Sequence, residues 1–283
     1  MTLQNKIDFV ALASVNMANP NGDPLNGNRP RTDYNNYGEI MDVCVKRKLR
    51  NRMQDMGYPI FVQSDDRADD GLHSLKERAK GMEKIKNPEE FAQTACKKWM
   101  DVRSFGQVFT FDSNKKEFAC SSVGVRGPVS IHPAFSIDPV DVISVQITKS
   151  VSFDRKNEAT RGSDTMGQKH FVRFGLYKIK GSINVQLAEK TGFTVEDAAV
   201  IKECLRTLFV NDASSARPDG SMEVLSLYWF EHSCKDGQYS SAEVHRSVKV
   251  QRKDGVQFPA SVDDYEITLV DLPGLKPEIL KGL

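Results

Sequence analysis

The sequence IDFVALASVNMANPNGDPLNGNRPRTD, residues 7–33, joins two stretches of opposite character. Apolar side chains dominate residues 6–17, where helix breakers are almost absent, and this pattern predicts a buried strand. Residues 19–33 contain four Asn, two Gly, three Pro, two Arg and two Asp, with a single apolar side chain, Leu25. Such a composition predicts neither a helix nor a core strand. The loop is therefore either an idle surface turn or a loop that holds a ligand.

Three helices are predicted from periodicity and capping signals. Apolar residues recur every three or four positions over residues 38–56, which predicts a helix that ends at the following Gly and Pro. The sequence Asn87-Pro88-Glu89-Glu90 predicts the first turn of a second helix. Thr194 and Asp197 resemble a capping box and predict the start of a third helix.

Strands are predicted where apolar residues alternate or run together. They cover residues 123–131 (interrupted by an Arg-Gly-Pro sequence), 140–147, 177–187, 222–232, 244–250 and 265–270. A polar segment, residues 60–98, is inserted before these strands. Without it the order is strand, helix, strand, strand, helix, strand, which is the order of ferredoxin-like and RNA-recognition folds. The expected fold class is therefore α+β.

Composition limits the kind of protein. With 283 residues, 39% hydrophobic and 27% charged, the chain can bury a normal core in one large domain or two small ones. The formal net charge of +1 excludes a uniformly basic protein, so a polyanionic partner must meet locally gathered Lys and Arg. The five Cys form no C-x-x-C pair, and neither a signal peptide nor a run of 18 apolar residues is present. We expect a cytoplasmic protein that is neither secreted nor membrane-spanning.

The sequence contains no common catalytic motif. It has no P-loop, no dinucleotide-binding glycine motif, no zinc-protease motif and no nucleophile elbow, and its five His are dispersed. No metal and no cofactor is therefore predicted. Asp23, Asp33 and Asp42 could serve as the carboxylates of a metal-dependent nuclease. The favoured interpretation is that Asp23 makes an Asx-type turn and Asp33 caps the helix that begins soon after.

A cluster of positive side chains follows the loop. The sequence VKRKLRNR, residues 45–52, places Lys46 and Arg50 one helical turn apart, and the loop itself carries Arg29 and Arg31. By itself such a run is as often a solvated helix face as a binding surface. Beside a loop rich in Gly and Asn, whose backbone amides can approach a phosphate closely, it favours contact with a nucleic-acid backbone.

Five motifs occur in order along the chain. They are NPNGDPLNGNRPRTD (19–33), DVRSFGQVF (101–109), RGPVSI (126–131), GLYKIKGSINVQLAEKTGF (175–193) and NDASSARPDGSMEV (211–224). Together these motifs resemble the backbone subunit of CRISPR-associated type I-C Cascade surveillance complexes, which belongs to the RAMP superfamily. The matches are spread over roughly residues 7–232, and five ordered motifs are far more specific than any one of them.

The resemblance implies a fold and a domain organisation. A modified RNA-recognition palm, with helical finger insertions and a thumb β-hairpin, is expected over residues 1–283. The finger-like insertion is expected at residues 57–98, the thumb hairpin at 150–169, and C-terminal strands with a tail at 235–283.

The resemblance also implies a function without catalysis. Copies of such a subunit polymerise along one CRISPR RNA (crRNA), grip its phosphate backbone, and leave bases exposed to pair with target DNA. The other implied partners are the crRNA 5′-end-capping subunit, the large subunit and the small subunit of Cascade. DNA cutting belongs to a separate, recruited enzyme.

The site residues implied by the resemblance lie in five places: the first loop, the basic helix, the motif RGPVSI, the thumb and a second polar loop. RNA-binding roles are expected for Asn19, Asn21, Gly22, Asp23, Arg29, Arg31, Lys46, Arg50, Arg126, Met166, Lys169, Ser214, Ser215 and Arg217. Arg29 and Arg31 are expected to contact phosphates. Met166 is either an apolar wedge against the RNA or an ordinary hairpin contact.

Two other functions stay open. The first is a metal-dependent endoribonuclease of the same superfamily, in which Asp23 or Asp33 would supply a carboxylate. The second is a stand-alone single-stranded RNA-binding module that stacks bases on aromatic side chains. Phe9 and the sequence Tyr228-Trp229-Phe230 are the candidates for such stacking, although about half of the side chains in a strand must face the core.

Overall fold

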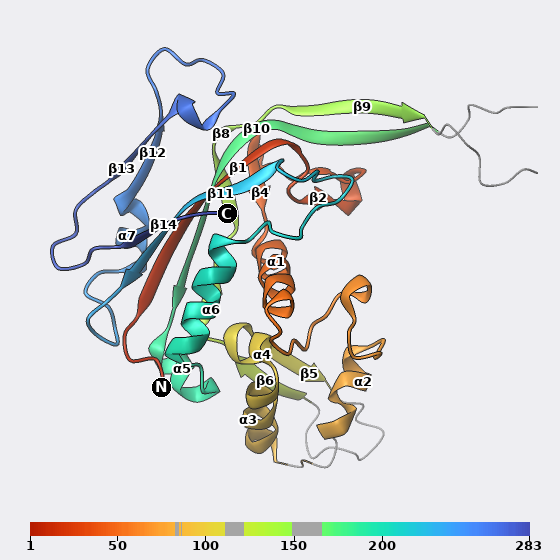
Figure 1. Cartoon of the computed structure of the whole chain (residues 1–283), viewed down its shortest axis with the longest axis vertical. Helices are drawn as coiled ribbons and strands as arrows, with labels where there is room; N and C mark the ends of the chain where they lie inside the picture. Colours follow the sequence, from red (N-terminus) through yellow and green to blue (C-terminus); the bar gives the residue numbers. More distant parts are fainter. Residues whose placement is uncertain (83–84, 86, 111–121, 149–165) are drawn as a thin grey trace, which may run out of the picture.

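The computed structural model describes residues 1–82, 85, 87–110, 122–148 and 166–283. An eight-stranded antiparallel sheet forms its centre, with the strand order β14-β11-β1-β10-β8-β4, and both β7 and β9 pair with β10 (Figure 1). These strands are β1 (Ile7–Ala18), β4 (Tyr37–Ile40), β7 (Val129–Ile131), β8 (Ala134–Pro139), β9 (Val142–Thr148), β10 (Met166–Ile183), β11 (Met222–Glu231) and β14 (Glu278–Lys281).

Both faces of the sheet are covered. One face packs against α1 (Asp42–Asp55), α5 (Val185–Thr191) and α6 (Val195–Arg206), and the other against α7 (Ser241–Ser247), β12 (Val248–Arg252) and β13 (Tyr265–Leu269). Successive residues of β1 point to opposite faces of the sheet. Phe9 enters one core and its neighbour Val10 enters the other, and both are fully buried. Burial on both sides explains why β1 has a continuous apolar sequence instead of an alternating one.

A second lobe lies below α1 in Figure 1. It contains α2 (Leu75–Ala79), α3 (Pro88–Lys98), α4 (Met100–Phe105) and a small sheet of β5 (Gly106–Thr110) and β6 (Ser122–Arg126). Its apolar core gathers Phe61, Phe91, Trp99, Phe109 and Val123, with the Phe61 ring centroid 4.7 Å from that of Trp99. The segment expected to be polar therefore has its own core, which includes side chains from beyond residue 98.

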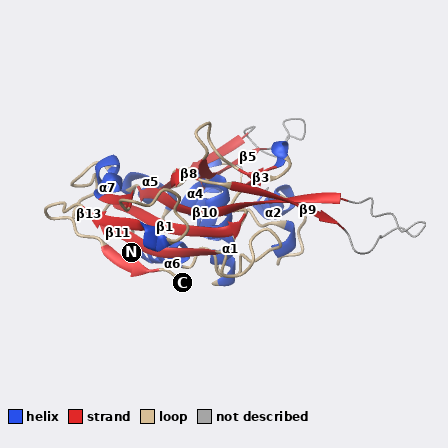
Figure 2. Cartoon of the chain, turned by 90° about the horizontal axis from the view of Figure 1, so that it is seen from above, coloured by secondary structure: helices blue, strands red, loops and turns tan. Residues whose placement is uncertain are grey.

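A two-stranded ribbon projects from the sheet (Figures 1 and 2). It consists of β9 and the first part of β10, paired in antiparallel register from Val142↔Val172 to Thr148↔Met166. Residues 150–165 of the expected thumb lie outside the described residues, whereas its last four residues begin β10. No helix of the described residues is long and apolar enough to cross a membrane.

Several local predictions are confirmed. The Asn87 side chain accepts hydrogen bonds from the backbone N–H groups of Glu89 and Glu90 at the start of α3. Thr194 and Asp197 form a reciprocal capping box at the start of α6. The strands predicted at residues 6–17 and 222–232 are β1 and β11, and the Arg-Gly-Pro sequence separates β6 from β7.

Several boundaries were wrong. The strand predicted from residue 177 begins at Met166, and three segments form a different element from the one predicted. Residues 37–40 form the edge strand β4, so the first helix begins at Asp42 instead of residue 38. Residues 185–187 start α5, because the Asn184 side chain accepts the N–H of Leu187 and ends β10 at Ile183. Residues 244–247 belong to α7, which Ser240 caps by accepting the N–H of Glu243.

Candidate nucleic-acid interface

The loop at residues 19–33 is a small hairpin. Strands β2 (Gly22–Asp23) and β3 (Arg29–Pro30) flank a 3₁₀ turn at Pro24–Asn26. The Asp23 carboxylate accepts the N–H of Leu25 at 3.3 Å, which confirms the predicted Asx-type turn, and pairs with Arg31 at 3.2 Å. Gly27 and Asn28 both have a φ of 59°, the left-handed conformation that Gly and Asn adopt at low cost.

Asn side chains and a Gly residue maintain the shape of this loop. Asn19 is buried and donates from Nδ2 to the backbone oxygen of Asn28 at 2.7 Å. Asn21 accepts the N–H of Met41 at 3.0 Å, which connects the loop to the start of α1. A Cβ on Gly22 would lie 2.0 Å from Oδ1 of Asn28, so any larger residue there would displace the Asn28 side chain.

Asp33 does not cap the helix, and that prediction was wrong. Its Oδ1 accepts the N–H groups of Asn35 and Tyr37, each at 2.9 Å, so it closes the turn that leads into β4. The first helix begins nine residues after Asp33.

Three segments distant in sequence meet at the base of the ribbon. Arg29 donates from Nη1 to Oγ of Ser144 at 2.7 Å and lies 3.4 Å from Nδ1 of His170, so the first loop contacts both ribbon strands. Lys169 donates from Nζ to the backbone oxygen of Ser215 at 3.2 Å. The N–H of Asn19 donates to the oxygen of Ala216 at 2.9 Å. We call this surface, formed by residues 19–33, 142–148, 166–172 and 211–221, the candidate interface.

The two loops contact opposite faces of the ribbon. Ser144 and His170 are cross-strand partners and therefore share one face. Lys169 pairs with Val145 on the other face, from which its long side chain reaches Ser215. The ribbon base is thus held between the loop at 19–33 and the loop at 211–221.

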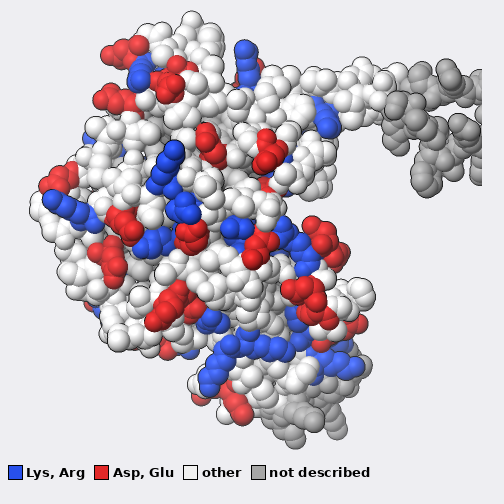
Figure 3. All heavy atoms as spheres, in the orientation of Figure 1, with Lys and Arg blue, Asp and Glu red and all other residues white. Residues whose placement is uncertain are grey.

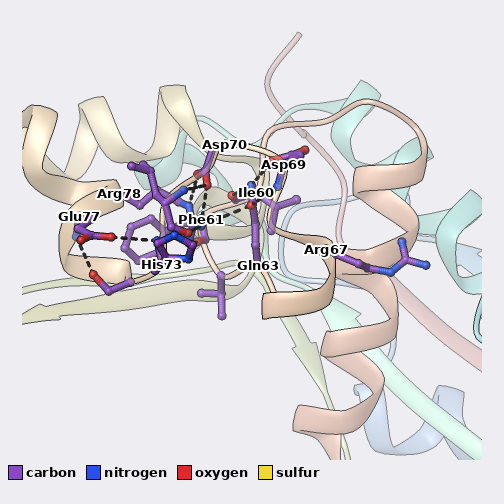
Figure 4. Close-up of polar contacts among 12 residues, drawn as sticks. Ile60, Phe61, Gln63, Arg67, Asp69, Asp70, His73, Glu77 and Arg78 are labelled. Carbon is purple, nitrogen blue, oxygen red and sulfur yellow. Dashed lines mark hydrogen bonds and ion pairs between the residues drawn. The ribbon is translucent and has the colours of Figure 1, made fainter.

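The loop at 211–221 exposes Ser214 and Ser215. Arg217 is half-buried, and its Nε lies 3.0 Å from Oδ2 of Asp212. Asn211 has a φ of 58°, and its backbone oxygen accepts a hydrogen bond from Arg67 at 3.0 Å. Through Arg67 this loop is connected to the segment of the second lobe drawn in Figure 4.

Figure 4 shows how that segment is held. The Arg78 guanidinium, which is buried, forms a two-point ion pair with Asp70 and donates to the backbone oxygens of Phe61 and Leu72 at 2.9 and 3.1 Å. Hydrogen bonding to Arg78 lowers the pKa of the Asp70 carboxyl to about 2. Arg67 points away from this cluster, toward Asp55 and the loop at 211–221.

The cations of α1 are engaged within the protein. Lys46 pairs with Asp42 at 2.7 Å, Arg47 donates to the backbone oxygen of Val62, and Lys48 pairs with Asp212. Arg50 lies 2.9 Å from the fully buried Asp101, and its guanidinium carbon lies 5.1 Å from the ring centroid of Phe105. Helix α1 is therefore not a freely solvated basic face. Contact of Lys46 and Arg50 with RNA stays a prediction, and it would require these ion pairs to open.

The remaining predicted residues lie in different surroundings. Met166 is 62% exposed at the first residue of β10, and Gln146 donates to its sulfur. Arg126 is exposed at the end of β6, in the second lobe, and no described contact joins it to the candidate interface. On the face seen in Figure 3, Lys and Arg side chains are interspersed with Asp and Glu.

Sequence reasoning missed Ser144, His170 and Asp212. Each acts at the candidate interface through a partner at a distance in sequence: 115 residues separate Ser144 from Arg29, and 164 separate Asp212 from Lys48. Only the strand register and the packing of α1 bring them together. Asp101 could have been noticed in the sequence, because it is the first residue of the motif DVRSFGQVF. Its ion pair with Arg50 could not be deduced from that motif.

The aromatic candidates for base stacking are all in the cores. Phe9, Tyr228, Trp229 and Phe230 are between 0 and 7% exposed. Phe9 stacks on Trp229 with 5.8 Å between ring centroids. Since the sheet is covered on both faces, these rings cannot receive RNA bases in this fold. Within the described part of the chain, no group of three or more His, Cys, Asp or Glu is placed to hold a metal ion.

The fold of the chain is similar to that of subunits in solved structures. A chain of a "CRISPR RNA-guided surveillance complex, pre-nicking" has a TM-score of 0.51 at 14% identity and covers 89% of this chain and 84% of its own length. A chain of a "CRISPR RNA-guided surveillance complex" has a TM-score of 0.49 at 17% identity, with 89% and 78% covered. The first likeness shows a shared mixed α/β fold with subunits of such complexes.

Sequence comparison identifies the family. The family described as "CRISPR-associated protein Cas7" matches residues 5–270, and the chain belongs to this family. A relative from Haloferax volcanii, also a "CRISPR-associated protein Cas7", is 27% identical over 213 residues, which cover 70% of this chain. The matched region spans 62% of that relative's length.

Proposed function

We propose that the chain is a non-catalytic backbone subunit of a type I-C Cascade complex. Copies of it polymerise along crRNA and hold the phosphate backbone, so that the bases remain free to pair with target DNA. The 5′-end-capping, large and small subunits complete the complex. The observation that carries this proposal is the meeting of two polar loops at the base of a projecting ribbon, in a chain of the Cas7 family.

The chemistry of the candidate interface fits RNA phosphates. Guanidinium and ammonium groups at Arg29, Arg31 and Lys169 lie beside backbone N–H groups and exposed Ser hydroxyls, which are the groups that contact phosphate and sugar. Such contacts carry no sequence information, so binding should be similar for unrelated RNAs.

The strand order supports a palm built on an RNA-recognition-like fold. Strands β11, β1, β10 and β8 are neighbours in the central sheet, and α1 and α6 lie on one face of it. We assign the ribbon to the base of the thumb, the second lobe to the finger-like insertion, and residues 235–283 to C-terminal strands and a tail. Within this last part, α7, β12 and β13 cover the other face of the palm and β14 adds an edge strand to its sheet.

A structural role for the acidic residues favours binding over catalysis. Asp23 is engaged by Arg31 and by the N–H of Leu25, and Asp33 by two backbone N–H groups. Both carboxylates thus have a role in the turns of the first loop. The endoribonuclease alternative would require one of them to leave these contacts and bind a metal.

The experiment is a salt titration of RNA binding by a double variant, Arg29→Ala with Lys169→Ala. We expect weaker binding and a log–log salt slope that is smaller by roughly 1.4, because each phosphate contact on single strands contributes about 0.7. Lys249→Ala, on the exposed surface of β12, is the matched control and should change neither quantity. Labelled RNA recovered from the same mixtures with Mg²⁺ should be intact. An unchanged salt slope in the double variant would contradict the assignment of Arg29 and Lys169 to phosphate contacts. Metal-dependent cleavage of the RNA that is lost in Asp23→Ala would favour the endoribonuclease.

A further inference from the structure

Asp212 is the second residue of the loop at 211–221. Its Oδ2 pairs both with Lys48 of α1 and with Arg217 of the same loop. The Lys48 side chain is only 4% exposed, and that of Asp212 is 14% exposed. The Lys48 ammonium also lies 5.6 Å from the ring centroid of Phe209, three residues before Asp212. One carboxylate therefore fastens the loop to the helix beneath it.

The turn that follows Asp212 carries the two hydrogen bonds that join this loop to the ribbon and to the loop at 19–33. Ser214 and Arg217 bridge each other through backbone hydrogen bonds of 2.8 and 3.1 Å, so Ser215 and Ala216 form the tip. The backbone oxygen of Ser215 receives Lys169 of the ribbon, and that of Ala216 receives the N–H of Asn19. The tip therefore contacts both other segments of the candidate interface.

We infer that Asp212 is a positioning residue of the RNA-binding surface: it orients Arg217 and holds the loop at 211–221 against α1, so that the three segments of the interface stay aligned. This inference rests on the proposed function. It predicts an effect opposite in sign to simple electrostatics, because removing a negative charge beside a polyanion should tighten binding unless that charge holds the site together.

Burial explains why the loop depends on this residue. Burial lowers the pKa of Lys48, and the Asp212 carboxylate opposes that shift. Without Asp212 the buried ammonium would have no anion beside it, and its release toward water would move α1 and the loop apart. Arg217 would lose the contact that fixes its guanidinium in one orientation.

The test measures affinity for a single-stranded RNA and thermal stability in three variants. Asp212→Asn should bind RNA at least about tenfold more weakly than the wild type, although its net charge is more positive by one. Asp219→Asn has the same charge change at an exposed position of the same loop and should bind slightly more tightly. Because Asp212→Asn leaves a buried ammonium, the variant with Lys48→Met and Asp212→Asn is measured beside it, and it should also bind more weakly.

The outcomes separate the inference from the proposed function. If the wild type binds RNA and either folded Asp212 variant binds as tightly or more tightly, the positioning role is wrong and the proposed function stands. If Asp212→Asn does not fold, the Lys48→Met, Asp212→Asn variant decides by the same criterion. If the wild type does not bind RNA at all, both the proposed function and the inference that rests on it fail.

Discussion

Asp101 shows how a single carboxylate connects the two lobes. It is fully buried, accepts the backbone N–H groups of Phe61 and Val62 at 2.8 and 3.1 Å, and lies 2.9 Å from Nε of Arg50. The Arg50 side chain is only 12% exposed. A buried ion pair of this kind adds modest net stability while intact, but loss of one partner leaves an uncompensated charge.

We expect Asp101→Ala to lower the free energy of unfolding by about 3–5 kcal/mol, because Arg50 and two backbone N–H groups would lose their acceptor. Urea denaturation measures this change. Asp271→Ala, at an exposed position, should change stability by less than about 0.5 kcal/mol. A cost at Asp101 no larger than at Asp271 would show that Arg50 finds water or another anion.

Asp70 should make stability depend on pH. Its pKa is about 2 in the folded protein, below its ordinary value of 3.8, so the pair with Arg78 stabilises the folded state when the pH is above the ordinary value. That contribution is lost as the pH falls through the folded pKa. Asp70→Asn should therefore be less stable than the wild type near neutral pH, and the difference should shrink between about pH 4 and pH 2. Denaturant unfolding at several pH values measures it, and a difference that does not vary with pH would contradict the assignment.

Residue types alone indicated the cations of α1 but not their partners. The sequence VKRKLRNR predicted a basic helix face; the structure shows the helix, but its cations are engaged within the protein. Its cations pair with Val62, Asp101 and Asp212, which lie 15, 51 and 164 residues away from Arg47, Arg50 and Lys48. The periodicity of a helix reflects only neighbours within a few residues. Partners at such large separations in sequence, and therefore the burial of these cations, could not be predicted from it.

At the scale of elements, helix starts were predictable only where a cap preceded a long periodic segment. Asn87 and Thr194 cap helices of 11 and 12 residues, and both were predicted. Asn184 and Ser240 have the same capping chemistry, but the helices that follow have seven residues each. Over so few residues, apolar positions can alternate by chance, and both segments were therefore assigned to strands.

The ribbon leads to a prediction about assembly. Val145 and Ile147 lie on one face of β9 and are 43 and 41% exposed, and a two-stranded ribbon projecting from its sheet has little support of its own. In the proposed polymer, a neighbouring copy covers this face. Val145→Ser with Ile147→Ser should therefore reduce assembly on long RNA, while the unfolding free energy changes by less than about 1 kcal/mol.

The matched control for the ribbon is Ile267→Ser with Leu269→Ser. These residues alternate in the same way on β13 and are 37 and 39% exposed. Electron microscopy of protein mixed with long RNA measures assembly for both variants. Equal filament lengths in the ribbon variant and the wild type would contradict a role of this face in contacts between copies.

At the scale of the whole molecule, the covering of both sheet faces determines where RNA can bind. Because the C-terminal layer of α7, β12 and β13 buries Tyr228 and Phe230, the sheet surface is not available for stacking bases. The proposed function therefore assigns RNA binding to the sheet end where the ribbon and the two loops meet. The order of β1, α1, α3, β9, β10, α6 and β11 could be predicted from the sequence. The covering of the second face could not, since β1 has a similar apolar sequence whichever element packs there.

The proposed function requires that many copies bind one RNA through its backbone. Native mass spectrometry with single-stranded RNAs of increasing length and unrelated sequence tests it most directly. We expect masses to increase in steps of one 31.7 kDa chain, with the same length of RNA for each added chain whatever the sequence. A single bound chain at every RNA length, or binding confined to one sequence, would contradict the account.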